Sequence, residues 1–396
     1  MRKLVLCLLT GVLIALITAR SLLPESARAV SSDGETYGYN ICSVSLPITT
    51  ETAGSALIAD MNGYYLFRSP TAKNEWTGVL GGKDLILICA EDWRVPSSPG
   101  RYSDSALYRL ARGSAHISEV YRTDWYQGAA GQFFALLTGV VPTTVDGMSA
   151  LSWTGEQDTY LPYAIARCLS AEGYACAAFI GDEAQRAGLL ALGFDTVTAA
   201  EEPAEERISA ELSSLTDAGR YFGFWHWRGD GEAALEALFD LLKQTRRLDD
   251  TVICLLAGAE DEERGILYIY SRELTGAVCR RPCSGLDVTP TLLNLFGLEY
   301  DSRFLSGLDI FSTNGETGVV RAVTPVVSLY GSAFSDWVSD AGSYSVAGSI
   351  FRQTADCFDS SEEVSAYVHD VSRLVYDRYI YARKAMEYNY FRVALG

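Results

Sequence analysis

The chain has 396 residues, a net charge of −18 at pH 7, and 48% hydrophobic against 21% charged residues. This apolar composition excludes an intrinsically disordered protein. The negative charge excludes nucleic acid and anionic membrane surfaces as non-specific partners. The length suits one large domain with an appendage, or two domains.

The N-terminal residues are typical of a targeting segment. Arg2 and Lys3 precede an apolar run at 4–19, and residues 27–29 (ARA) resemble a cleavage site between small residues. The run is short for a membrane-spanning helix, so a cleaved signal peptide is the simpler interpretation and a single uncleaved anchor is the alternative. Either way, we expect the chain beyond residue 30 to lie outside the cytoplasm, with membrane contact only through this segment.

Strand-like and helical segments alternate through the middle of the chain. Apolar runs typical of strands buried on both faces lie at 84–90, 174–180, 221–225 and 251–256, and amphipathic helical patterns lie at 160–172 and 231–244. The alternation predicts an α/β fold, a three-layer, mostly parallel sheet with helices on both faces. Right-handed crossovers then place the strand carboxyl ends, and any site, along one edge of the sheet.

The composition changes after about residue 318. Residues 324–351 are rich in Val, Ser, Tyr and Gly, which predicts antiparallel strands, and Ser360 followed by Glu362 and Glu363 predicts a helix start. We therefore expect a small C-terminal α+β subdomain. The predicted parts are the N-terminal segment 1–29, a stalk or flap 30–80, the main α/β domain 81–318 and the C-terminal subdomain 319–396.

Eight of the nine cysteines follow the apolar N-terminal run. Two close pairs, Cys168 with Cys176 and Cys279 with Cys283, are compatible with disulfides in an oxidising compartment. Spacing alone leaves the connectivity open.

Several short motifs follow one another in an order that resembles one known family. They are a strand ending in Glu91, then 133–142 (FFALLTGVVP), 286–297 (LDVTPTLLNLFG), 307–311 (GLDIF), 330–334 (YGSAF) and 388–392 (YNYFR). The order is similar to that in the extracytoplasmic domain of lipoteichoic acid synthases and related sulfatases of the alkaline phosphatase superfamily. The resemblance extends over residues 83–392 and implies that the main domain is sulfatase-like.

The family's chemistry identifies the positions that matter. A threonine oxygen attacks phosphorus or sulfur, while a divalent ion such as Mn²⁺ or Mg²⁺ lowers the threonine pKa and neutralises the developing charge. The resemblance places the glutamate ligand at Glu91, the threonine at Ala129, and the Gly-Asp-His metal motif at Gly258, Ala259 and Glu260. We therefore expect no catalytic residue and no cofactor, with Glu91 as a vestigial metal ligand. Mn or Mg is implied only if the chain is active.

Three more residues are candidates to line a pocket: Asp92, His226 and Arg228. His226 lies near the position of a substrate-facing histidine in the family, although a buried structural histidine is the more common case. Arg228 suits an anion, or simply a solvated surface. Thr123, considered as a displaced nucleophile, requires an unusual loop to reach the site.

Acidic residues gather where two of the predicted strands end. Glu91 and Asp92 follow one strand, and residues 259–263 (AEDEE) follow another. Such an oxygen cluster suits a non-catalytic Ca²⁺ or Mg²⁺ ion, and a solvated acidic loop is the simpler interpretation.

These observations predict an exported, catalytically degenerate protein with an accessory or binding role in the cell envelope. Its partner, a glycopolymer or an envelope protein, is not specified by the sequence. The alternative is an active metal-dependent phosphoglycerol transferase, phosphodiesterase or sulfatase. A third hypothesis, an interaction module on an unrelated α/β fold, is disfavoured by residues 286–297 and by the C-terminal motifs.

Overall fold

The computed structural model describes residues 29–30, 36–42, 53–96, 105–125, 127–200, 204–216, 219–260, 264–312, 325–354 and 357–395. The targeting segment predicted at 1–29 lies almost wholly outside this range, as does most of the acidic run 259–263. Within the described ranges, no helix combines the length and apolar character needed to cross a membrane.

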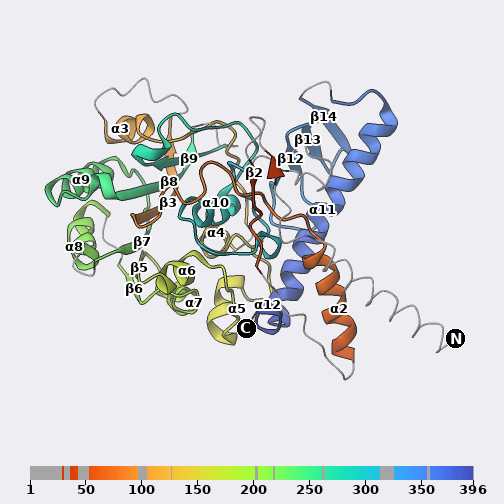
Figure 1. Cartoon of the computed structure of the whole chain (residues 1–396), viewed down its shortest axis with the longest axis horizontal. Helices are drawn as coiled ribbons and strands as arrows, with labels where there is room; N and C mark the ends of the chain where they lie inside the picture. Colours follow the sequence, from red (N-terminus) through yellow and green to blue (C-terminus); the bar gives the residue numbers. More distant parts are fainter. Residues whose placement is uncertain are drawn as a thin grey trace.

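A six-stranded sheet forms the centre of the molecule (Figure 1). In spatial order its strands are β6 (Thr196–Ala199), β5 (Ala175–Ile180), β7 (Tyr221–His226), β3 (Asp84–Val95), β8 (Thr251–Ala259) and β9 (Gly265–Tyr270). The first five are parallel, and β9 runs antiparallel to β8. The predicted mostly parallel sheet is confirmed, and its four apolar runs are β3, β5, β7 and β8.

Successive side chains of β3 enter two separate hydrophobic cores. Leu85 and Leu87 belong to one core, whereas Ile86 and Ile88 belong to the other. Because side chains alternate across a strand, a run that is apolar at every position is buried on both faces. The helices that contribute to the first core include α4 (Ala129–Thr138), α5 (Ala150–Gln157), α6 (Ile165–Ala171), α7 (Arg186–Ala191) and α10 (Val288–Leu295), and those of the second include α3 (Ala106–Arg112), α8 (Ala204–Thr216) and α9 (Glu232–Gln244).

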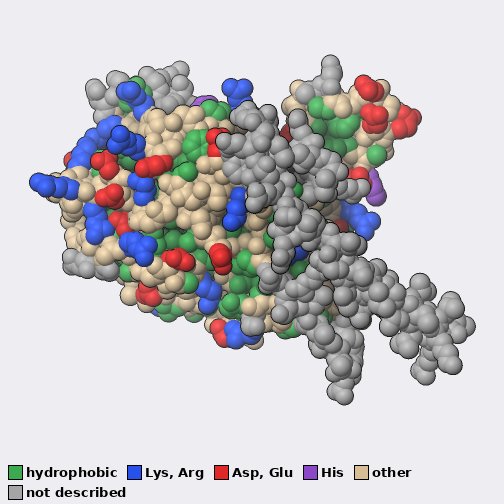
Figure 2. Space-filling view, in the orientation of Figure 1, with side chains coloured by type: hydrophobic (Ala, Val, Ile, Leu, Met, Phe, Trp, Pro, Cys, Tyr) green, Lys and Arg blue, Asp and Glu red, His purple; other side chains and the backbone are tan. Residues whose placement is uncertain are grey.

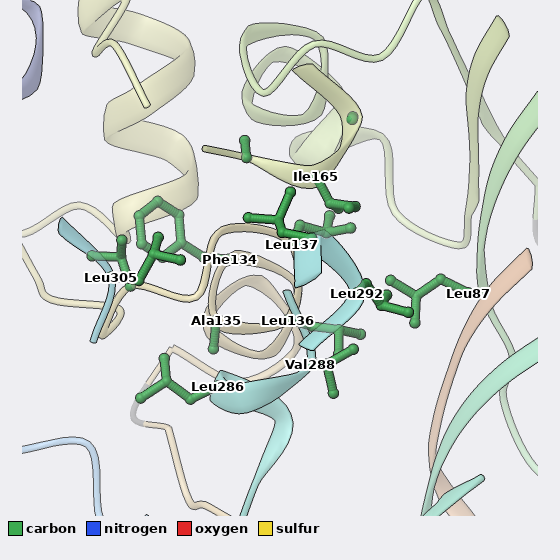
Figure 3. Close-up of a cluster of buried hydrophobic side chains, with 14 of the residues drawn as sticks. Leu87, Phe134, Ala135, Leu136, Leu137, Ile165, Leu286, Val288, Leu292 and Leu305 are labelled. Carbon is green, nitrogen blue, oxygen red and sulfur yellow. The ribbon is translucent and has the colours of Figure 1, made fainter. Parts of the chain in front are cut away.

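Helices α4 and α10 form the inner part of the first core. In Figure 3, Leu136 of α4 faces Val288 of α10, and Leu292 of α10 lies beside Leu87 of β3. The Thr289 hydroxyl donates a hydrogen bond of 2.7 Å to the carbonyl of Leu136. All eight residues of α10 are buried, and its one amide side chain, Asn294, donates a hydrogen bond of 3.0 Å to Asp309.

The C-terminal part combines an antiparallel sheet with a long helix, as predicted. The sheet contains β11 (Val326–Ser328), β12 (Trp337–Ser339), β13 (Gly342–Ser345) and β14 (Ile350–Gln353), followed by α11 (Ser361–Glu387) and α12 (Tyr390–Leu395). Trp337 packs with Val371 and Val375 of α11 in a small separate core. Ser360 caps α11, since its side chain accepts a hydrogen bond of 3.2 Å from the backbone of Glu363.

Helix α2 (Ala53–Leu66) comes from the predicted stalk or flap and packs along α11. The Tyr64 ring stacks on Tyr381 at 3.9 Å, and Asp60 pairs with Lys384 at 2.6 Å. Helices α2 and α11 therefore lie side by side (Figure 1). The remaining strands are β1 (Ala29–Val30), β2 (Thr36–Tyr37), β4 (His116–Ile117) and β10 (Val278–Cys279).

One expectation needs correction. The helix predicted at 160–172 begins only at Ile165, because Pro162 lies in a turn before it. The sequence left the state of the cysteines open, and the two close pairs, Cys168 with Cys176 and Cys279 with Cys283, are free thiols in this structure.

Candidate functional site

Strand β3 continues past the acidic pair that the sequence places at its end. Its pairing with β8 shifts register between Ala90 and Arg94, so Glu91, Asp92 and Trp93 form a bulge. A bulge redirects side chains out of the regular pleat and is common beside functional sites. Asp92 is exposed, and the side chain of Glu91 is outside the described part of the chain. The role of Glu91 as a vestigial ligand therefore stays a prediction.

Helix α4 begins at Ala129, where the family resemblance expects the threonine nucleophile. Gly128 precedes it at φ 55°, and no side chain caps the helix. The first turn continues with Ala130 and Gly131, and a Cβ at Gly131 would lie only 2.9 Å from the Cβ of Trp125. This turn therefore presents methyl groups and bare backbone, with no side-chain oxygen that can attack an electrophile.

The expected metal motif is equally poor in ligands. Ala259 is 2% exposed, and its N–H donates to the carbonyl of Arg264 at 3.0 Å. Glu260 is exposed, and its N–H donates to the carbonyl of Val95 at 3.1 Å. A protein-bound Mn²⁺ or Mg²⁺ needs carboxylate or imidazole ligands that converge on it. Among the described residues, no group of three or more His, Cys, Asp or Glu is placed to share an ion; the side chain of Glu91 and residues 261–263 lie outside that part of the chain.

His226 ends β7 and packs against α4. Its ring centroid lies 4.8 Å from that of Phe133 in an edge-to-face contact. Its Nδ1 is buried and has no hydrogen-bond partner among the described residues. Burial lowers the pKa of His226 to about 4; the positive charge of Arg228 adds to this effect, and the negative charge of Asp92 opposes it. The imidazole is therefore neutral at pH 7, and its surroundings favour a structural role.

Arg228 extends across the same edge of the sheet. A Cβ added at Gly181, just after β5, would lie 3.1 Å from the guanidinium carbon of Arg228. The residue is exposed, which agrees with a solvated cation. His226, Arg228 and Asp92 thus occupy one edge of the sheet, close enough for their charges to act on one another.

The segment before α4 forms a polar pocket that no motif in the sequence predicts. Thr123 lines this pocket with Arg122, Gln132 and Gly258, at the carboxyl end of β8. The Gln132 side-chain amide donates a hydrogen bond of 3.1 Å to the carbonyl of Thr123, which holds this segment against α4. Isolated bridges, such as the one between Tyr121 and distant Arg264, fix the path of the segment that contains Thr123, and its role as a displaced nucleophile stays untested. No spacing in the sequence signals these bridges.

The pKa of His226 leads to a prediction for stability against pH. Between pH 6.5 and about 4 the unfolded chain binds a proton at this residue and the folded chain does not, so stability falls as the pH falls through that window. His226→Phe keeps a ring against Phe133 and cannot titrate. We expect this variant to lose less stability between about pH 7 and about pH 4.5, by on the order of 2 kcal/mol after allowance for partial exposure.

Urea unfolding of both proteins at the two pH values measures the difference. His369→Gln, which changes an exposed histidine of α11, is the matched control and should retain the full acid loss. Equal acid loss in the wild-type chain and His226→Phe would contradict the prediction.

The architecture is similar to that of several solved structures. The lipoteichoic acid synthase LtaP from Listeria monocytogenes matches with a TM-score of 0.59 and 14% identity, over 85% of this chain and 98% of that chain. A protein in the alkaline phosphatase superfamily from Vibrio parahaemolyticus matches with a TM-score of 0.55 and 15% identity, over 86% and 98%. No family model and no curated protein matches the sequence. The fold of this chain is therefore the one shared by lipoteichoic acid synthase LtaP and the alkaline phosphatase superfamily, as its motifs predict.

Proposed function

We propose that this chain is a catalytically inactive protein of the lipoteichoic acid synthase type, with a binding or accessory role in the cell envelope. The observation that carries the proposal is Ala129 at the first position of α4. The reaction of the family needs an oxygen nucleophile at this position, and an alanine methyl group has no lone pair to attack with. A shared fold does not restore that chemistry, because function depends on the groups in the site.

The metal positions support the same proposal. Ala259 contributes a buried methyl group, and Glu260 an exposed carboxylate, where the resemblance expects an aspartate and a histidine. Without a divalent ion, the charge that develops during phosphoryl or sulfuryl transfer lacks the counter-charge on which the family's reaction depends. The proposed loss of the nucleophile and the proposed loss of the metal ligands involve different positions, and either one alone would abolish the reaction.

The envelope location rests on the N-terminal sequence. Arg2, Lys3 and the apolar run at 4–19 are typical of a signal peptide or a single anchor. We propose that this segment (1–29) is followed along the chain by the stalk or flap 30–80, the sulfatase-like domain 81–318 and the C-terminal subdomain 319–396. The protein is then secreted or anchored, and its partner is an envelope glycopolymer or an envelope protein.

Calorimetric titration of the full chain with Mn²⁺, with Mg²⁺ and Ca²⁺ as comparisons, tests the proposal. We expect no binding of Mn²⁺ at millimolar concentrations and no turnover of phosphodiester or sulfate-ester substrates. Glu91→Ala should behave like the wild-type chain. The double variant Ala259→Asp with Glu260→His is the positive control, and it should gain affinity for Mn²⁺ because it restores two ligands.

The alternative makes the opposite prediction. Micromolar Mn²⁺ binding that is lost in Glu91→Ala, together with turnover, would establish an active phosphoglycerol transferase, phosphodiesterase or sulfatase. Turnover without Mn²⁺ binding would also overturn the proposal, because it would require a nucleophile outside position 129.

A further inference from the structure

The Thr123 hydroxyl is a buried polar group that the fold leaves unsatisfied. The residue is 5% exposed, and its Oγ1 has no hydrogen-bond partner in the described part of the chain. Most buried hydroxyls have a partner, so one without a partner calls for an explanation such as a bound water or ligand. Thr123 also lines a pocket with Gln132 and Gly258, so a ligand partner for this hydroxyl would have to come from the pocket side.

The size and chemistry of this pocket select a neutral hydroxyl group. Its enclosed part has room for about one water-sized group, which is too little for a tetrahedral oxyanion. The side chains of Thr123 and Gln132 can each donate and accept a hydrogen bond, as a hydroxyl ligand can. Arg122 also lines the pocket and brings a positive charge. A negative charge lies nearby as well, because Glu119 accepts a hydrogen bond from the hydroxyl of Tyr121, another lining residue.

Exposed aromatic side chains lie on a neighbouring loop. This loop forms backbone hydrogen bonds with Asp124, the residue that follows Thr123. On this loop, which joins β11 to β12, Phe334 is 75% exposed and Tyr330 is 45% exposed. The Phe334 ring centroid lies 5.5 Å from that of Tyr376 on α11, which is itself 39% exposed. We call these three residues the aromatic platform. Several exposed rings on neighbouring segments are typical of an interaction surface.

Backbone hydrogen bonds join the platform to the pocket. The N–H of Asp124 donates to the carbonyl of Leu329 at 2.8 Å, and the N–H of Gly331 donates to the carbonyl of Asp124 at 2.9 Å. A Cβ at Gly331 would lie 2.4 Å from the ring of Trp125, so the loop approaches this segment as closely as a glycine allows. Pocket and platform are therefore held in a fixed relation, which reduces the entropic cost of binding a ligand to both.

We propose that the Thr123 pocket and the aromatic platform together bind an uncharged sugar chain. The C–H bonds on the face of a sugar ring carry a small positive charge and are attracted to the negative face of an aromatic ring. One sugar hydroxyl then enters the pocket and hydrogen-bonds to Thr123 and Gln132. This assignment rests on the binding role proposed above and names its ligand class.

The charge of the molecule favours a neutral glycan over a polyanion. The net charge is −18. On the face shown in Figure 2, basic and acidic side chains are interspersed over α3, α8 and α9 and do not gather into a basic surface. A polyanionic polymer would be repelled by this charge, whereas an uncharged sugar chain would not.

Titration of the full chain with chitohexaose and with maltohexaose, followed by intrinsic fluorescence and calorimetry, tests the proposal. We expect saturable binding of at least one of the two. Phe334→Ala should weaken it about tenfold, through loss of a stacking face. Thr123→Val, which removes only the hydroxyl, should weaken it several-fold without lowering the Tm, because that hydroxyl has no partner in the fold. Tyr388→Ala, at an aromatic residue that is 50% exposed beyond the platform, is the matched control and should bind normally.

Three results would overturn the proposal: no binding of either oligosaccharide at millimolar concentrations, binding unaffected by Phe334→Ala and Thr123→Val, or tighter binding of a sulfated oligosaccharide of equal length. None of these bears on the inactivity of the site, which the Mn²⁺ titration and turnover assays test separately. Turnover by the wild-type chain would overturn the proposed function whatever the sugar-binding result.

Discussion

Leu292→Ala is expected to lower the free energy of unfolding by about 3 kcal/mol, within the range for leucine in a well-packed core. Leu292 is fully buried in α10 and lies between α4 and Leu87 of the central strand β3 (Figure 3). Truncation removes apolar contacts and leaves a cavity that three packed elements cannot easily close. The loss combines the transfer of the missing atoms with the cost of the empty space.

Urea unfolding followed by circular dichroism measures this loss. Leu190→Ala is the matched control, because Leu190 lies on α7 and is 43% exposed. It should cost less than about 1 kcal/mol. Equal effects of the two truncations would show that α10 is not the centre of the first core.

Gly307→Ala is expected to cost about 3 kcal/mol or more, through a clash that no side-chain rotation relieves. A Cβ at this position would lie 2.0 Å from the carbonyl oxygen of Leu286 and 3.1 Å from the Cα of Asp287. The N–H of Gly307 also donates to the carbonyl of Gly139, just after α4, at 3.0 Å. Backbone on both sides would have to move, and this movement would disturb the junction of α4 and α10.

Gly63→Ala is the matched control for the same chemical change. Gly63 lies inside α2, and a Cβ there meets nothing within 4 Å. Alanine should therefore stabilise this helix by about 0.5–1 kcal/mol. Thermal and urea unfolding of both variants should show shifts of opposite sign, and a neutral Gly307→Ala would contradict the close approach.

This contact gives a physical reason for one of the sequence motifs. The motif at 307–311 (GLDIF) resembles a family pattern, and its glycine sits where two segments of backbone meet. The motif reflects packing here, not chemistry. A motif that resembles the family can therefore reflect the fold alone, independently of any reaction.

Local patterns in the sequence determined the architecture. A strand buried on both faces must be apolar at every position, so β3, β5, β7 and β8 are visible as continuous runs. The helix that begins after Ser360 is visible because helix capping is set by neighbouring residues. The proposed assignment of Ala129, Ala259 and Glu260 to the nucleophile and metal-ligand positions also comes from the sequence alone, through the order of the short motifs around them.

Only the tertiary structure decided the details of the edge where a site would lie. The bulge that carries β3 beyond Ala90 depends on pairing with β8, and a charged pair in the sequence gives no sign of it. The position of Thr123 depends on the bridges from Tyr121 to Arg264 and from Asp124 to Tyr330, which join residues far apart in the chain. Such contacts have no period and no fixed spacing. The sequence therefore determined the layers of this protein, whereas long-range pairing decided which side chains meet at their edge.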